Sequence, residues 1–213
     1  ANTGVVSGAN RLVIAEDVTL GSSGQESYPY LYIETGANVV INGGNIGKET
    51  QNRGSLTITG DTKPSAALTN YGKLVLNCNM EAGKFVLAPD SETLIKGGTY
   101  KFTIEENERN GLKIETGTFK DLRKSGGNTV WGEKEIDQYL ASGAKVSYDG
   151  TGDIKVWTVT MPVTGVALNK STMELQVGKT ETLTATVTPE NATDKTVIWT
   201  SSNTAVAAVD ANG

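Results

Sequence analysis

The sequence predicts an all-β protein of two segments, residues 1–160 and 161–213, in which a solenoid of short strands is followed by a β-sandwich. Gly accounts for 25 of the 213 residues and only 20% of residues are charged, a composition typical of many short strands joined by turns. A phrase with alternating apolar residues recurs at Leu31–Gly36, Leu56–Gly60 and Leu112–Gly117. Each phrase places its Leu and Ile on one face of a strand and a polar residue on the other.

Strands of this length cannot bury their apolar faces alone, so neighbouring strands must stack into a continuous core. Leu31 and Leu56 are 25 residues apart, which predicts a solenoid with coils of roughly 20–28 residues. We expect Ile33, Ile58 and Ile114 at equivalent inward positions of a single stacked sheet. Hairpins of a sandwich, whose strands would recur every ~8–12 residues, remain the alternative on pattern alone.

The end of the first segment is similar to a known fold. The stretches Leu94–Phe102, Leu112–Asp121 and Glu135–Val159 resemble the last coils of right-handed parallel β-helices on large secreted proteins of Gram-positive gut bacteria. In those proteins a Gly-Gly-Thr-aromatic coil is followed by a short helix. A hairpin that pairs residues 144–148 with residues 154–159 is expected to follow that helix here.

Two further parts of the first segment are predicted to be structural. A helix is expected over Glu133–Ala141, because Ile136, Tyr139 and Leu140 would share one of its faces. Cys78, the single cysteine, cannot form an internal disulfide and is expected to be a small buried hydrophobic residue beside a strand.

The second segment begins after residue 162 and has a different pattern. The stretches Leu168–Thr193, Val197–Asn203 and Ala205–Gly213 closely resemble a group 2 bacterial immunoglobulin-like domain. Trp199 is expected to be the large residue of its core. The alternation of apolar residues predicts inward positions at Leu175, Val177, Leu183, Ala185 and Val187.

The last residues predict two strands, Val197–Thr200 and Ala205–Val209, on either side of a turn at residues 201–203. The resemblance implies about three further strands after Gly213 that this sequence lacks, so we expect a truncated sandwich with open sheet edges. Such edges predict self-association through this segment, by edge pairing or strand exchange.

The resemblance to parallel β-helices raises an enzymatic alternative, because pectate lyases and polygalacturonases share that fold. The sequence has no histidine, which excludes a histidine general base, a His-containing triad and an imidazole metal ligand. The Gly-His-Gly motif of polygalacturonase-type glycosidases is excluded as well. A carboxylate pair within Glu105, Glu106 and Glu108 is formally open, but this run is typical of a solvated loop. We therefore predict that the protein is not an enzyme.

Charge and composition limit the partners of the chain. The net charge of −5 and the acidic pI argue against nucleic acid and anionic membrane surfaces, which require a basic stripe. No apolar run reaches the ~18–20 residues of a membrane span. Asp149 and Asp153 supply too few carboxylates for a Ca²⁺ site, so a turn is expected there. No cofactor or metal is predicted.

Three tyrosines form the candidate ligand-binding stretch. On an extended strand, Tyr28, Tyr30 and Tyr32 share one face, opposite Leu31 and Ile33. Their rings either stack on sugars, supplying apolar area and hydroxyl groups, or shield the open end of the solenoid.

These observations predict a non-catalytic protein that is secreted by a bacterium or attached to its cell wall. It resembles cell-surface adhesins, in which a β-helix presents a surface on an immunoglobulin-like stalk. The expected partner is a glycan or a host or cell-surface protein. The alternative function is a polysaccharide-degrading or polysaccharide-binding β-helix.

Overall fold

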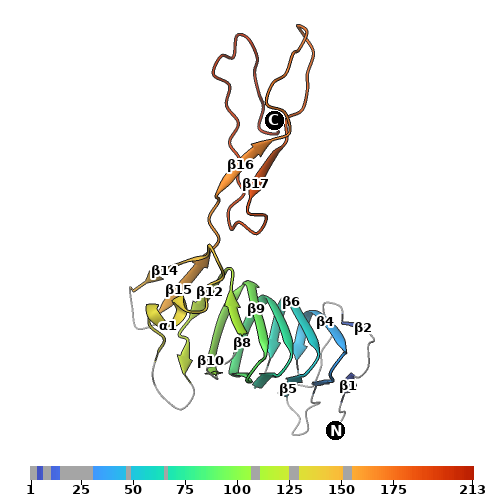
Figure 1. Cartoon of the computed structure of the whole chain (residues 1–213), viewed down its shortest axis with the longest axis vertical. Coiled ribbons are helices and arrows are strands. Elements are labelled where there is room, and N and C mark those ends of the chain that lie inside the picture. The colour runs from blue at the N-terminus through green and yellow to red at the C-terminus, as the bar shows by residue number, and fades with distance from the viewer. Residues whose placement is uncertain are drawn as a thin grey trace. The chain divides into compact units, whose positions relative to one another are not determined.

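The computed structural model is all-β, as the composition predicts, and the chain divides into two compact units, Ala1–Thr160 and Met161–Gly213 (Figure 1). Within the described part of the chain, α1 (Glu133–Asp137) is the only helix. The structure describes residues 4–6, 11–14, 31–46, 49–64, 67–106, 111–124, 130–150 and 155–213.

The first unit is a solenoid of parallel strands, and each coil runs along three walls in turn. The first wall contains β1 (Gly4–Val6), β3 (Leu31–Ile33), β5 (Glu49–Asn52), β7 (Ala67–Asn70), the end of β8 (Lys73–Leu87), the end of β10 (Thr99–Glu106) and β13 (Arg123–Lys124). The second wall contains β2 (Arg11–Ile14), β4 (Asn38–Ile46), β6 (Ser55–Pro64), the start of β8, β9 (Glu92–Gly97) and β11 (Gly111–Ile114). After the next corner, the remaining parts of β4, β6, β8 and β10 form the third wall with β12 (Gly117–Lys120).

The coils are shorter than the sequence predicts. On the second wall Val39 pairs with Leu56, and Leu56 pairs with Leu74. Asn52 and Asn70, which occupy the same wall position on successive coils, lie 18 residues apart in the sequence. The coil length predicted from the spacing of Leu31 and Leu56 is therefore wrong. The cause is that Leu31 lies on the first wall and Leu56 on the second, so their spacing measures one coil plus part of the next.

The predicted equivalence of three isoleucines is correct for two of them. Ile58 and Ile114 lie in one inward row of the second wall, which also contains Ile41, Leu76 and Ile95. Ile33 is equally buried, but it lies on the first wall, in register with Asn52. The strands of the described solenoid belong to one 15-stranded sheet, as predicted, and the corners divide it into three walls. The parallel registers exclude the hairpin sandwich for this unit.

Aromatic side chains fill the last coils. Tyr100 and Phe119, in register on the third wall, stack with ring centroids 5.3 Å apart, and Phe85 meets Phe102 edge to face at 5.2 Å. All four rings are buried. Ring contacts of this geometry stabilise the last coils beyond the effect of burial alone.

The end of the solenoid is covered by α1 and the turn that follows it. Trp131 and Ile136 are fully buried, and Trp131 stacks on Tyr139 at 5.2 Å. The helix is shorter than the predicted Glu133–Ala141 because the backbone of residues 139–141 bonds to the last coil: Ile114 donates to the Tyr139 carbonyl, and Ala141 donates to that of Ile114.

An antiparallel hairpin completes the third wall, as the sequence predicts. β15 (Val156–Thr160) pairs with β12 on one side and with β14 (Lys145–Asp149) on the other. Trp157 continues the inward row of Phe119, and Tyr148 lies opposite it with ring centroids 4.6 Å apart.

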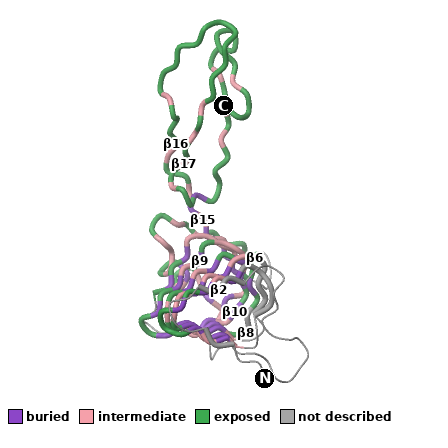
Figure 2. The backbone as a smooth tube through the Cα atoms, turned by 90° about the vertical axis from the view of Figure 1, so that its right-hand side faces the viewer, coloured by how far each residue is buried: buried purple, intermediate pink, exposed green. Residues whose placement is uncertain are grey.

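The second unit contains one short ladder, β16 (Gly165–Leu168) against β17 (Ala185–Thr188). The residues of the second unit are almost all exposed, whereas buried residues are concentrated in the coils of the first unit (Figure 2). Ala185 in β17 is half-buried, as are Leu183, Val187 and Trp199.

Several sequence predictions for the second unit are wrong. Val197–Thr200 and Ala205–Val209 are not strands, because no neighbouring segment offers them a ladder, and the Asn203 carbonyl instead accepts the amides of Val206 and Ala207 in a turn. Leu175 and Val177 are exposed rather than inward, since no second sheet covers them in the described structure.

Candidate functional site

Tyr32 lies on the outer face of the first wall. It stands between the buried residues Leu31 and Ile33 of β3, is half-buried, and is in register with Gln51 of the next coil. The strand alternation that predicts its outward direction is therefore confirmed for this residue. Tyr28 and Tyr30, the other two members of the predicted site, lie outside the described residues.

The corner between the first and second walls repeats an Asn-x-Gly motif. Asn52-Arg53-Gly54 and Asn70-Tyr71-Gly72 follow β5 and β7, which pair in parallel on successive coils, so one motif lies directly on the other. In each motif the asparagine is buried and the middle residue is exposed. The motif thus displays Arg53 and Tyr71 on neighbouring coils.

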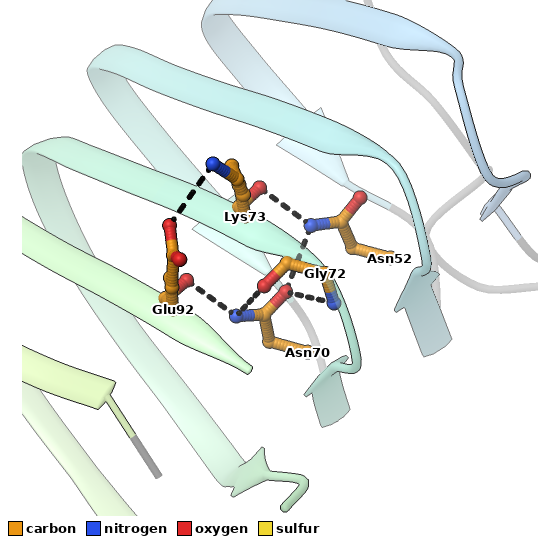
Figure 3. A network of polar contacts seen from close by, with 5 residues as sticks. All are labelled: Asn52, Asn70, Gly72, Lys73 and Glu92. Atoms are coloured by element: carbon orange, nitrogen blue, oxygen red, sulfur yellow. Dashed lines mark hydrogen bonds and ion pairs between the residues drawn. The ribbon is translucent and has the colours of Figure 1, made fainter. Parts of the chain in front are cut away.

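The two asparagines hold this corner from inside, as Figure 3 shows. Asn52 Nδ2 donates to Asn70 Oδ1 and to the Lys73 carbonyl, both at 2.8 Å. Asn70 Nδ2 donates to the carbonyls of Gly72 and Glu92 at 3.1 and 2.9 Å, and Asn70 Oδ1 accepts the Gly72 amide at 3.2 Å. A buried amide side chain with satisfied donors links coils and fixes the turn that it serves.

The glycines of the motif are required by close backbone packing. A Cβ at Gly72 would lie 2.2 Å from the Gly54 carbonyl oxygen, and a Cβ at Gly54 would lie 2.4 Å from that of Ala37. Each coil therefore packs on the corner before it without room for a side chain. This packing leaves Arg53 and Tyr71 on a rigid support.

Arg53 and Tyr71 interact directly. The Arg53 guanidinium carbon lies 5.3 Å from the centroid of the Tyr71 ring, within the range of a cation–π contact. Tyr71 remains 46% exposed. Four outward residues lie on the first wall and on the corner that follows it. We call them the corner surface: Tyr32, Gln51, Arg53 and Tyr71.

The corner surface has the chemistry of a sugar-binding surface. Tyrosine rings provide apolar area with a hydroxyl group at the end, which matches the C–H faces and hydroxyl groups of a pyranose. The Gln51 amide and the Arg53 guanidinium add further hydrogen-bonding groups, although Gln51 Nε2 already donates to Glu49 at 2.8 Å. Because these groups sit on a rigid support, binding would cost little ordering entropy.

The Asn-x-Gly corner was not predicted, because Asn70-Tyr71-Gly72 taken alone indicates only a turn. The repetition of Asn-x-Gly at an interval of one coil is the pattern that could have identified it. Two such motifs one coil apart place their middle residues side by side, but recognising this requires the correct coil length, which the sequence alone did not provide.

The other residues considered from the sequence lie at separate places in the solenoid where they are described. Glu105 forms an ion pair with Lys84 of the preceding coil, and Glu108 lies outside the described residues. Cys78 is buried in β8, as predicted. Asp149 ends β14, and Asp153 is not among the described residues. No group of three or more acidic or cysteine side chains in the described ranges could hold a metal ion.

Burial raises the pKa of the Tyr100 phenol well above its usual value, and the neighbouring Cys78 thiol adds to this effect. The Tyr100 hydroxyl, which comes from the third wall, donates to the Gly97 carbonyl at the end of β9. This perturbed group lies in the core rather than on an accessible surface, so its role is structural.

None of the described helices is long and apolar enough to cross a membrane.

Comparison with known proteins identifies the second unit. Residues 162–213 match the family of bacterial Ig-like domains, group 2. Two uncharacterized proteins of Clostridium acetobutylicum are 52% and 54% identical to this chain over 50 residues, which is 24% of this chain and 13% and 5% of those proteins. No solved structure matches.

A third relative extends further along the chain. An Ig-like virion protein of Serratia phage KSP90 is 33% identical over 138 residues, covering 59% of this chain and 51% of the phage protein. A match over more than half of the chain is longer than the second unit, Met161–Gly213, so it includes part of the solenoid. The chain thus spans about half the length of the phage protein and a small part of the two clostridial proteins.

Proposed function

We propose that this chain, whose residues 162–213 are a group 2 bacterial immunoglobulin-like domain, is a non-catalytic binding module displayed on the outside of a bacterial cell or a virion. In this proposal the solenoid contacts a glycan through the corner surface, and the immunoglobulin-like unit acts as a spacer. The relative from Serratia phage KSP90 supports the external location, because it is a virion protein and its similarity includes solenoid residues.

One observation carries the glycan contact: the Asn-x-Gly corner presents Arg53 and Tyr71 on a support that is fixed by buried amides and close backbone packing. A surface built this firmly around an exposed aromatic ring favours ligand contact, because a purely structural turn does not require Arg or Tyr at its exposed position. Tyr32, one row away on the same wall, extends the surface.

The proposal is tested by incubating the intact protein with plant, mucin and bacterial cell-surface glycans. Both retention on the immobilised glycan and release of reducing ends are measured. We expect retention of at least one glycan class without release of products. Reducing ends that disappear when one acidic residue is replaced would instead support the polysaccharide-degrading alternative.

Tyrosine variants locate the contact. Tyr71→Ser and Tyr32→Ser should each weaken retention by roughly fivefold or more, since ring contacts of this kind contribute about 1 kcal/mol or more. Tyr148→Ser is the matched control, because Tyr148 is exposed to 47% against 46% for Tyr71 but lies in β14 at the end of the solenoid. An equal loss in the Tyr148 variant would show that the corner surface is not the site.

A further inference from the structure

Arg53 on the corner surface has no carboxylate partner among the described residues. The ion pairs of the solenoid join Lys73 to Glu92, Lys84 to Glu105 and Arg123 to Asp121. Arg53 instead contacts the Tyr71 ring. Its guanidinium therefore keeps the planar set of N–H donors that binds a carboxylate through two parallel hydrogen bonds.

The Tyr71 ring orients this donor set. A guanidinium that lies over an aromatic ring is held in one plane, and its N–H groups point outward around the edge of that plane. The ring is supported in turn by Asn70 and Gly72, which have fixed positions in the coil. The donors are consequently preorganised rather than mobile on a free side chain.

The charged residues around Arg53 are a lysine with a partner and an exposed carboxylate. Lys73 lies two residues after Tyr71 at the start of the second wall, with its side chain 70% exposed, and it is paired with Glu92 at 3.2 Å. Glu34 is exposed on the same corner, one coil earlier than Arg53. It follows Ile33, whose carbonyl accepts a hydrogen bond from the Arg53 amide. No ion pair joins Glu34 to Arg53.

We propose that Arg53 and Tyr71 bind a carboxylated sugar within a glycan, either a uronate or a sialate. The Arg53 guanidinium binds the carboxylate, while the exposed rim and hydroxyl group of Tyr71 contact the pyranose ring and one of its hydroxyl groups. This inference rests on the proposed function and deepens it, because it names the ligand class and the residue that selects it.

The test is calorimetric titration of the intact chain with two pairs of probes. Trigalacturonate is compared with its carboxyl-reduced form, and 3′-sialyllactose with lactose, so that the two sources of the carboxylate are distinguished. We expect one acidic probe to bind roughly tenfold more tightly than its neutral counterpart. Arg53→Gln should remove this difference between the acidic and the neutral probe, and Arg53→Lys should retain part of it.

Matched charge changes separate a specific site from general attraction. Lys113→Gln removes one exposed positive charge from the second wall and should leave both affinities unchanged. Glu34→Gln removes the nearby competing carboxylate and should strengthen binding of the acidic probe. Thermal unfolding curves of all variants should coincide with that of the wild type, since each of these side chains is exposed.

The failures of the two proposals differ. Suppose that the acidic and neutral probes bind with equal affinity, and that Tyr32→Ser weakens this binding whereas Arg53→Gln does not. This result would overturn the carboxylate site and leave the proposed function standing. An equal loss in Lys113→Gln and Arg53→Gln would also overturn it, since the effect would then be one of net charge. Absence of binding to these probes and to every glycan of the wider panel would overturn the proposed function itself.

Discussion

Asn70 is the residue on which the candidate site depends most. It is fully buried and makes hydrogen bonds to two coils through both ends of its amide, including one to Thr93 Oγ1 at 2.9 Å. Asn52 is less completely bonded, because its Oδ1 has no partner among the described residues. The amide at residue 70 thus links the coil that presents Arg53 to the coil that presents Tyr71.

Asn70→Ala should lower the free energy of unfolding of the solenoid by about 2–4 kcal/mol, because several buried donors and acceptors lose their partner at once. Urea unfolding followed by far-UV circular dichroism measures the change. Asn38→Ala, which alters an exposed asparagine at the start of β4, one coil before Asn52, should cost less than about 0.5 kcal/mol. Similar costs for the two variants would contradict the structural role of Asn70.

The Tyr100 phenol predicts a loss of stability in alkali. Burial raises its pKa in the folded state, so the folded protein holds this proton more tightly than the unfolded chain. The resulting stability is complete below about pH 10, where an unfolded tyrosine ionises, and falls at higher pH by up to about 1.4 kcal/mol per pH unit.

Tyr100→Phe tests this by removing the ionising group while keeping the ring. The variant should be less stable at neutral pH by about 1 kcal/mol, because the hydrogen bond to Gly97 is lost. Between about pH 9 and 11 it should lose less stability than the wild type, as measured by urea unfolding at each pH. Tyr71→Phe is the control, and parallel pH profiles for wild type and Tyr100→Phe would refute the prediction.

At the scale of elements, the walls depend on corners that accept only glycine. Gly72 shows this most clearly, since an added Cβ would lie 2.2 Å from the Gly54 carbonyl oxygen and 2.8 Å from the Arg53 backbone. A clash with backbone cannot be relieved by a rotamer change, so the coils themselves would have to separate.

Gly72→Ala should therefore destabilise the solenoid by about 2 kcal/mol or more, as measured by thermal or urea unfolding. Gly97→Ala is the matched control on the second wall, because its Cβ would meet only side-chain atoms of Asn77 and Thr116, which can move. The control should lose clearly less stability. If Gly97→Ala proved the more damaging substitution, the close approach at the corner would not be the cause.

The sequence predicts the elements better than it predicts their stacking. Alternation identifies the inward residues Ile33, Ile58 and Ile114 correctly, because side-chain direction is a local property of a strand. The prediction that Ile33 lies in the same row as Ile58 and Ile114 is wrong. The members of a row depend on the length of a coil and on the positions of its corners, and both are set by contacts with residues one coil away. The contact between Arg53 and Tyr71 was missed for the same reason, because the two residues lie on successive coils.

Local pattern also overstated the strands of the second unit. Residues 197–200 and 205–209 have high strand propensity, but a strand exists only where another strand pairs with it. Tyr32 was found from the sequence because alternation alone settles its outward direction, whereas its neighbours on the corner surface were not.

At the scale of the whole molecule, the two units differ in how they bury apolar side chains. The solenoid contains a continuous row of buried Leu, Ile and aromatic residues, whereas the second unit leaves Ile198 and Val206 exposed to 84% and 81%, and Val177 fully exposed. Large apolar side chains in water favour association with other surfaces.

We predict that the chain self-associates reversibly through the second unit. Light scattering should show an average mass above that of one chain, and this mass should fall on dilution. A variant with Val177→Ser, Ile198→Ser and Val206→Ser should be monomeric over the same concentration range, because the apolar contact area is removed. Tyr71→Ser with Tyr148→Ser serves as the control on the solenoid, and monomeric behaviour of the wild type at all concentrations would contradict the prediction.

The central claim is that a glycan binds to the corner surface of the solenoid, and amide chemical-shift mapping tests its location most directly. The ¹⁵N-labelled chain is titrated with the tightest-binding oligosaccharide of the panel and followed residue by residue. The account predicts that the shifts concentrate on the amides of residues 31–34, 50–54 and 68–73, while β14 and the immunoglobulin-like unit remain unchanged. Shifts confined to the outer face of the second wall or to residues 162–213 would contradict it.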